Sequence, residues 1–372
     1  MATAIVSGVL AGKLGNGGNA WARLSVVVGL RRLGFKAFFI EQLEQASPES
    51  IGYFEKVVTQ LGLAGSAALV AGRECYGIER PELEAIAADA ALLINFGGHL
   101  TIPALMRPAR CKVYLDDDPG FTQFWEAAGT SSARLAEHDI YFTFGENIGR
   151  AGCRVPTGGI EWHPTRPVVV LADWPVAAVD APGVFTTVAT WRGPYGPVTW
   201  NGHTYGLKLH EFRKFVDLPR LTGSSFELAL DIHSAEDSDI TLLREHGWRL
   251  VDPRAVAGDP FAFRTYVQES AAEYSAAQGI YVETQCGWFS DRTVRYLASG
   301  KPVLVQDTGF SNNLPTGDGL IAFRTLDEAA AGAQSIASDY QRHSDAARAL
   351  AEEYFDSDLV LGRLVEQTAV AP

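Results

Sequence analysis

A short segment between residues 286 and 305 combines a helix start with fixed positive charge. Ser290 or Asp291 is typical of a helix N-cap, and Gly300 fits the position after the last turn, before an apolar strand. A helix N-terminus presents backbone N–H groups and the positive end of its dipole, and Arg292 and Arg295 add charge suited to phosphate. An ordinary strand–helix–strand unit with solvated arginines is the alternative. The predicted phosphate-binding residues of this segment are Ser290, Asp291, Arg292, Thr293 and Arg295.

A glycine-rich turn near the N-terminus is the second candidate. It follows an apolar run at 3–10 and precedes a helical pattern at 20–33, and such a turn directs backbone amides at a ligand. The candidate residues are Gly15, Gly17, Gly18 and Asn19. Gly15-x-Gly17-x-x-Ala20, followed by Glu41, also satisfies a loose dinucleotide fingerprint. An NAD-dependent oxidoreductase and a plain flexible turn therefore remain alternatives.

Polar side chains follow two predicted strands of the first half. His99 follows the strand at 91–96, and Asp116, Asp117 and Asp118 follow the strand at 111–115. A histidine titrates near neutrality, and adjacent carboxylates raise one another's pKa, so these four residues are the candidate catalytic acids and bases. A capping histidine and a solvated Asp-Pro-Gly turn are the alternatives.

The elements that must position these residues alternate between strands and helices in both halves of the chain. This alternation predicts α/β architecture with parallel doubly wound sheets, in which ligands bind beyond the carboxyl ends of the strands. A chain of 372 residues is too long for one ordinary core. A proline- and glycine-rich region at 155–197 holds the boundary, which we place near Asp180. We predict domains at 1–180 and 181–355, with 356–372 packing back toward the first.

Composition and charge narrow the possible partners. The net charge of −13 disfavours an extended nucleic-acid surface. No apolar run reaches the roughly 18 residues that span a bilayer, and the N-terminus lacks a basic leader. The four cysteines are far apart and predict free thiols in a reducing cytoplasm, with no zinc site. We expect a cytoplasmic monomer or homodimer.

Three ordered stretches carry a resemblance to a known family. Residues 298–303 read Ala-Ser-Gly-Lys-Pro-Val, 155–164 form a Pro- and Gly-containing turn, and 185–193 end in Trp-Arg-Gly. Together they resemble the GT-B glycosyltransferases of the family 4 and family 1 types. The resemblance implies two Rossmann-like doubly wound domains that face each other across a cleft. Its usual pair of glutamates is replaced by Gly287 and Arg295, which leaves the retaining or inverting outcome and the ribose contact open.

The resemblance also implies roles for individual residues. Arg192 and Lys208 would neutralise the donor diphosphate together with the helix N-terminus, and residues 307–313 would lie near the sugar. The nucleotide base of the donor would lie against Leu250, Val251 and Asp252. The implied function is metal-independent transfer of a sugar from a UDP-sugar, or a GDP- or TDP-sugar, to a small-molecule or lipid-linked acceptor. No cofactor is expected besides this co-substrate. A non-catalytic nucleotide-sugar binder is a further alternative.

Overall fold

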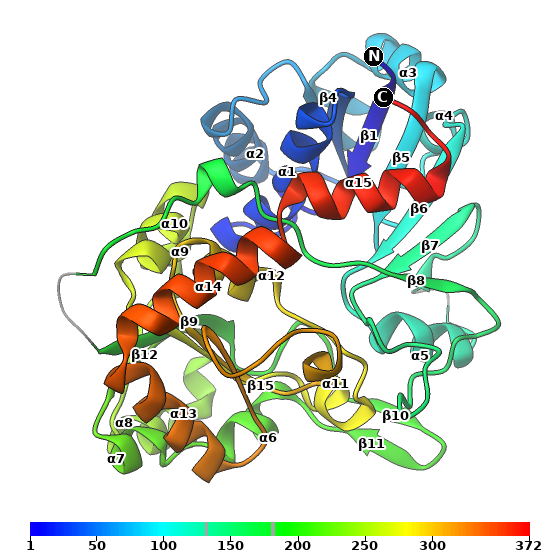
Figure 1. The fold of residues 1–372 in the computed structure, drawn as a ribbon. Helices are drawn as coiled ribbons and strands as arrows, with labels where there is room; N and C mark the ends of the chain where they lie inside the picture. The colour runs from blue at the N-terminus through cyan, green and yellow to red at the C-terminus, as the bar shows by residue number, and fades with distance from the viewer. Residues whose placement is uncertain (131–132, 180–182) are drawn as a thin grey trace.

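Two sheets flanked by helices form the two halves of the chain (Figure 1). The computed structural model describes residues 1–130, 133–179 and 183–372. The first sheet has eight strands, and all its neighbours are parallel except the edge pair β4–β3. In spatial order its strands are β4 (Glu74–Gly77), β3 (Ala67–Ala71), β2 (Lys36–Leu43), β1 (Thr3–Ser7), β5 (Ala90–Phe96), β6 (Cys111–Asp116), β7 (Ile140–Thr143) and β8 (Trp162–Pro164).

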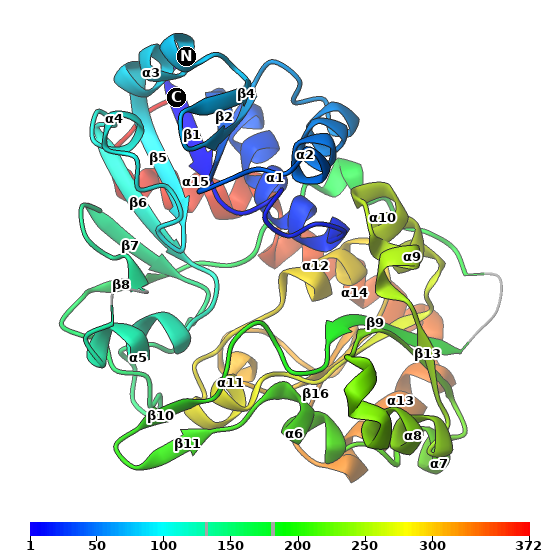
Figure 2. The same cartoon turned by 180° about the vertical axis from the view of Figure 1, so that it is seen from behind.

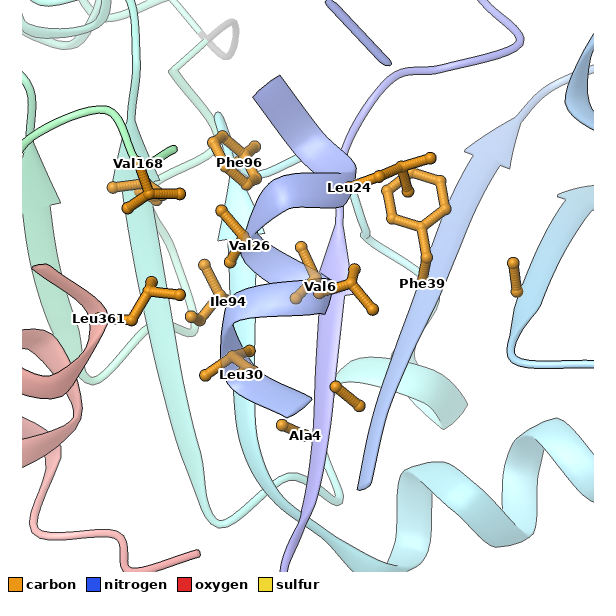
Figure 3. Packing of buried hydrophobic residues seen from close by; sticks show 14 of the residues in the cluster. Ala4, Val6, Leu24, Val26, Leu30, Phe39, Ile94, Phe96, Val168 and Leu361 are labelled. Carbon is orange, nitrogen blue, oxygen red and sulfur yellow. The ribbon is translucent and has the colours of Figure 1, made fainter. Parts of the chain in front are cut away.

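Helices cover both faces of this sheet, so its strands are apolar on both sides. Successive residues of β1 alternate between two cores: Ala4 and Val6 belong to one, and Ile5 to the other. Figure 3 shows the first of these cores, where Val6 of β1 lies between Leu24 and Leu30 of α1, the helix that packs over this strand. The helices of the first half are α1 (Gly17–Arg32), α2 (Pro48–Gln60), α3 (Arg80–Asp89), α4 (Pro103–Met106) and α5 (Phe121–Ala127).

The second sheet has six strands, all parallel. In spatial order they are β13 (Trp248–Val251), β12 (Ser225–Asp231), β9 (Val184–Thr190), β14 (Ala272–Ser275), β15 (Val303–Gln306) and β16 (Leu320–Phe323). Its helices are α6 (Lys208–Arg213), α7 (Leu218–Thr222), α8 (Asp237–Glu245), α9 (Pro253–Ala257), α10 (Pro260–Glu269), α11 (Gly279–Thr284), α12 (Asp291–Ala298), α13 (Leu326–Ser338) and α14 (Tyr340–Tyr354). The described part of the chain also contains the 3₁₀ turns η2 (Leu171–Asp173), η3 (Ser234–Glu236) and η4 (Phe310–Asn312).

The chain crosses between the halves twice, and the two crossings lie side by side. Val169 on the first crossing exchanges backbone hydrogen bonds with the second, since its N–H donates to Phe355 and its carbonyl accepts from Ser357, each at 2.9 Å. The second crossing delivers α15 (Ser357–Thr368), drawn in red in Figure 1, to the first half. There Leu361 packs against α1, where a Cβ on Gly29 would lie 2.5 Å from its methyl group.

A two-stranded hairpin reaches from the second half to the first. It consists of β10 (Val198–Trp200) and β11 (His203–Tyr205), and Figure 2 shows it beside α5. The ring of Phe124 on α5 lies 6.0 Å from Trp200 and 5.0 Å from Tyr205, measured between centroids. Aromatic packing of this kind fixes how the two halves face each other at this end.

The predicted fold class is confirmed. The helix predicted between residues 286 and 305 is also confirmed, with its start and the glycine after its end. Ser290 is the N-cap of α12, and Gly300 follows its end with a φ of +69°. The sequence pattern also predicts a short strand at 281–283, and this prediction is wrong, because these residues belong to the helix α11. The predicted boundary at 180/181 falls outside the described residues. No helix of the described chain is long and apolar enough to cross a bilayer.

The packing of α15 generates a stability prediction. Replacing Leu361, which is 1% exposed, with alanine should lower the free energy of unfolding by roughly 2–5 kcal/mol, since it opens a cavity between α15 and α1. The matched control is Leu359→Ala on the same helix, where the side chain is 44% exposed. Urea unfolding should show a loss for the first variant only, and equal losses would contradict the packing described.

Candidate functional site

A cleft of about 700 Å³ opens where the two halves face each other. Its floor is built by the carboxyl ends of β9, β12, β13 and β14, followed by the first turn of α12. Its other wall is made by the turn between β1 and α1, by Arg23 on α1, and by the ends of β6 and β7. Both parallel sheets therefore direct their ligand-binding edge into one space.

The predicted glycine-rich turn lies in this wall. Gly15, Gly18 and Asn19 line the cleft, and Gly15 has a φ of +69°, which favours glycine. Gly17 does not line it and serves close packing instead, because a Cβ there would lie 2.1 Å from the carbonyl oxygen of Asp259. The turn thus brings the N-terminus of α1 against the second half.

Glu41 contradicts the dinucleotide interpretation of the same turn. Its carboxylate is fully buried and accepts hydrogen bonds from the backbone N–H groups of Leu10, Ala11 and Gly12 at 2.8, 2.6 and 2.9 Å. Burial raises its pKa, and these three bonds oppose the rise. Glu41 therefore fixes the path of the chain after β1 and is not available to a ribose, which removes the residue on which the oxidoreductase alternative depended.

The three predicted catalytic aspartates lie in three different environments, and the first does not line the cleft. Asp116 is buried and accepts hydrogen bonds from Thr122 Oγ1, Gln123 Nε2 and Thr143 Oγ1, each at 2.7 Å. Burial raises its pKa to about 7. Its hydrogen bonds tie the start of α5 to β7, so a structural role replaces the catalytic role expected of Asp116.

The next two aspartates do line the cleft. Arg23 Nη2 donates to Asp117 Oδ2 at 2.5 Å, which pairs that carboxylate. Asp118 accepts hydrogen bonds from the hydroxyls of Tyr195 and Tyr281, each at 3.0 Å. Burial raises the pKa of Asp118, and the neighbouring Asp117 adds to the rise. Because both tyrosines belong to the second half, Asp118 lies at the junction of the two domains with a proton affinity suited to a general base.

His99 does not line the cleft. Burial, and after it the charges of Arg134 and Arg23, lower its pKa to about 4. The ring is therefore neutral at pH 7, and its Nε2 has no hydrogen-bond partner among the described residues. This placement gives the predicted catalytic role of His99 no support.

The first turn of α12 reaches the cleft through Ser290, Asp291 and Arg292. The Ser290 hydroxyl caps the helix by accepting from the N–H of Arg292 at 3.3 Å. The guanidinium of Arg292 is already occupied, since its Nε pairs with Glu273 at 2.6 Å and its other nitrogens donate to Val188 and Ser275. Arg292 contributes charge to the floor of the cleft but has few donors left for a ligand.

Three of the predicted phosphate ligands lie elsewhere. Arg192 does not line the cleft, and its side chain is 60% exposed and pairs with Glu236. Thr293 and Arg295 are fully buried and also absent from the cleft lining. All five side chains from this segment are polar. Sequence spacing alone therefore could not tell those that face the cleft from Thr293 and Arg295, which are buried.

Lys208 does line the cleft, at the first residue of α6. Desolvation lowers its pKa to about 7, and the charge of Arg292 adds to the shift while that of Glu273 opposes it. In the described structure no carboxylate forms an ion pair with this ammonium group. A half-buried lysine without a counter-ion is costly in an empty site and is relieved by a bound anion.

Counted with Lys208, the lining carries a small excess of positive charge. Six basic residues face five acidic ones, although the whole chain carries −13. The basic residues are Lys13, Arg23, Lys208, Arg244, Arg254 and Arg292; the acidic ones are Asp117, Asp118, Asp231, Asp252 and Asp291. Within the described residues, the side chains of Lys13, Lys208, Arg244 and Arg254 make no ion pair. The cleft is therefore suited to an anionic ligand.

The predicted base-binding residues also reach the cleft. Leu250 and Val251 end β13, and Asp252 caps α9 by accepting from the N–H of Arg254 at 2.9 Å. They lie in the same cavity as Lys208. Within the described residues, no group of three or more His, Cys, Asp or Glu side chains is arranged to hold a metal ion.

Sequence reasoning missed several residues of the cleft. Arg23 lay within an apolar helical pattern and gave no signal by itself. Tyr281 lies in the stretch predicted as a strand. In the structure it belongs to α11, and its hydroxyl donates to Asp118. Trp288 also lines the cleft and stacks on Tyr281 with ring centroids 4.4 Å apart, and nothing in its sequence context indicates this position. Gln278 is the N-cap of α11 and makes no side-chain capping bond, and Gly279 is its first residue, so neither residue gives a signal that a helix starts here.

No known family profile matches the chain, and no curated protein matches its sequence. Solved structures do match over its whole length. An α-glucosyltransferase in complex with UDP and a 13-mer DNA is 11% identical, with a TM-score of 0.65 and complete coverage of both chains. Anabaena HepE in complex with UDP and glucose is 12% identical, with a TM-score of 0.60 and 99% of each chain covered.

A third match is the sucrose-phosphate synthase of Thermosynechococcus elongatus, which is 12% identical, with a TM-score of 0.56 and 99% of each chain covered. The chain has the GT-B fold. At these identities the likeness establishes how the two halves are built and arranged, as the resemblance in the sequence implied. The chemistry in the cleft must be argued from its own residues.

Proposed function

We propose that this protein is a glycosyltransferase that transfers a sugar from a nucleoside diphosphate sugar, a UDP-sugar in the first instance, to a hydroxyl group of an acceptor. The observation that carries the proposal is the interdomain cleft, where unpaired cations meet the ends of both sheets. Support for the nucleotide comes from the solved structures of the same fold, among which the α-glucosyltransferase and HepE are complexes with UDP.

The second domain would hold the donor. Leu250 and Val251 offer an apolar edge and backbone groups to the base, and Lys208 offers an ammonium group to the diphosphate. The N-terminus of α12 adds backbone N–H groups. As the bond between the sugar and the diphosphate breaks, negative charge grows on the leaving oxygen, and Lys208 stabilises that charge more than it stabilises the ground state.

The first domain would activate the acceptor. Asp118 takes the proton of the acceptor hydroxyl, the acceptor oxygen forms its bond to the anomeric carbon, and UDP leaves with the electrons of the broken bond. Asp118 suits this step because its pKa is raised and it faces the cleft, whereas Asp117 is engaged by Arg23. The hydroxyls of Tyr195 and Tyr281 hold its carboxylate in place.

The acceptor is proposed to be a small or lipid-linked molecule and not a nucleic acid. The α-glucosyltransferase of the same fold is a complex with DNA, but a net charge of −13 repels a polyanion. Trp288 lines the cleft, stacks on Tyr281 and offers aromatic surface suited to a sugar ring or another planar group.

Replacing Lys208 with methionine should weaken UDP binding while leaving the fold at least as stable. The loss of a charge-assisted contact predicts a dissociation constant roughly 10- to 100-fold higher, and removal of a desolvated charge predicts an unchanged or raised melting temperature. Calorimetric titration with UDP and thermal unfolding measure the two effects. Lys36→Met, at the exposed start of β2, is the control. Equal UDP affinity in all three proteins would contradict the proposed donor site.

Donor binding should also depend on pH. The Lys208 pKa of about 7 in the free chain rises when a diphosphate binds, so the complex takes up a proton. Affinity for UDP-glucose, whose esterified diphosphate does not titrate in this range, should be constant below pH 7. Above it, affinity should fall by up to about tenfold per pH unit. Asp116 also titrates near pH 7, so a variant is needed that isolates the lysine. Lys208→Arg stays charged throughout this range, and its affinity for UDP-glucose should not change with pH. An equally steep profile in Lys208→Arg would assign the dependence to another group.

Asp118→Asn should separate catalysis from binding. Loss of the base predicts that sugar transfer from UDP-glucose, followed as UDP release in the presence of an acceptor panel, falls by about 10²- to 10⁴-fold. Affinity for UDP should change little. The exposed carboxylate variant Asp345→Asn serves as the control. If the unsubstituted protein bound UDP saturably yet released no UDP from UDP-glucose with any acceptor of the panel, that result would instead favour a non-catalytic nucleotide-sugar binder.

A further inference from the structure

A small second cavity adjoins the cleft and shares Arg23 and Asp291 with its lining. Its volume is about 20 Å³, which leaves room for a single occupant the size of a water molecule. Most of its wall is apolar and comes from β5, β6, α1 and α15, through residues that include Val26, Phe96 and Leu361. A charged group facing this space is therefore poorly solvated.

Three arginines line this cavity, and two of them are neutralised. Arg23 pairs with Asp117 at 2.5 Å, and Arg166 forms a two-pronged pair with Glu146 at 2.8 and 2.9 Å. Arg295 has no ion pair among the described residues. Arg295 therefore has no directly bonded counter-ion, and the opposing charge in the lining is the carboxylate of Asp291.

Arg295 is also short of hydrogen bonds. It is fully buried, and its Nη1 donates to the backbone carbonyl of Asp291, one turn earlier on α12. Its Nε and Nη2 have no partner within the described residues, and neither has the Nε of Arg23. Desolvation lowers the Arg295 pKa to about 10. Three unpartnered N–H-bearing nitrogens on two guanidinium groups therefore belong to residues that line one small cavity.

We propose that this cavity binds one small monovalent anion of halide size, held by Arg295 and Arg23. The volume excludes phosphate and sulfate. A water molecule could accept from two of the donors, but it brings no charge and needs acceptors for its own hydrogens. Among the described residues of the lining, the one carboxylate is that of Asp291, which forms no ion pair with Arg295 although its charge opposes the fall in the Arg295 pKa. A halide can accept from all three unpartnered nitrogens at once and places a negative charge beside Arg295, which has no bonded counter-ion.

Such an ion would steady α12, whose first turn forms part of the cleft floor. Because Arg295 belongs to α12 and Arg23 to α1, the bound anion joins a helix of the second domain to a helix of the first. This inference does not depend on the proposed glycosyltransferase activity, and its tests use no nucleotide.

Thermal unfolding of the full chain tests the proposal first. At equal ionic strength, sodium chloride and sodium bromide should raise the melting temperature saturably, by roughly 3 °C or more, relative to sodium gluconate, whose anion is too large for the cavity. The rise should vanish in Arg295→Met and persist in Arg363→Met, which removes an exposed arginine of α15. Equal melting temperatures in the three salts would overturn the proposal.

Crystallography of the unchanged protein provides a second test that does not rely on any variant folding. Crystals grown in sodium bromide should show a bromide anomalous peak within hydrogen-bond reach of Arg295 Nε or Nη2. A water molecule at this position, with no anomalous signal, would overturn the proposal even if the salts differed in their effect on stability.

Discussion

The positive charge of Lys208 enters the cleft without a carboxylate to pair with it. Folding alone gives no reason to keep a desolvated ammonium group whose pKa has fallen to about 7. A ligand with negative charge does, because it restores the lost solvation and raises the pKa again. Lys13, Arg244 and Arg254 also line the cleft without ion pairs in the described structure.

The scaffold serves to hold this charge opposite the first domain. Glu41 gathers three backbone N–H groups and fixes the turn after β1, and Gly17 allows that turn to approach Asp259 on the second domain. The paired crossings at Val169 and Phe355 connect the halves at one end. The aromatic contacts of Phe124 connect them at the other. The cleft is thus framed by contacts that do not themselves touch the ligand.

Periodicity and turn residues were sufficient to predict the two α/β halves and the α12 segment, because burial on both faces of a parallel sheet leaves continuous apolar runs that are easy to recognise. The site was only partly predictable. Lys208 and the first turn of α12 line the cleft, but Arg192 pairs with Glu236 outside its lining and Arg295 is buried. Which way an arginine points depends on tertiary partners, and those partners are far away in sequence. The same holds for Tyr281, whose role depends on Asp118 in the other domain.

A crystal structure of the chain with bound UDP tests the central claim most directly. We expect the diphosphate in the interdomain cleft, with Lys208 Nζ within hydrogen-bond distance of a phosphate oxygen and the nucleotide base against Leu250 and Val251. A diphosphate bound outside the cleft, or held by Arg192 with Lys208 still unpaired, would contradict it.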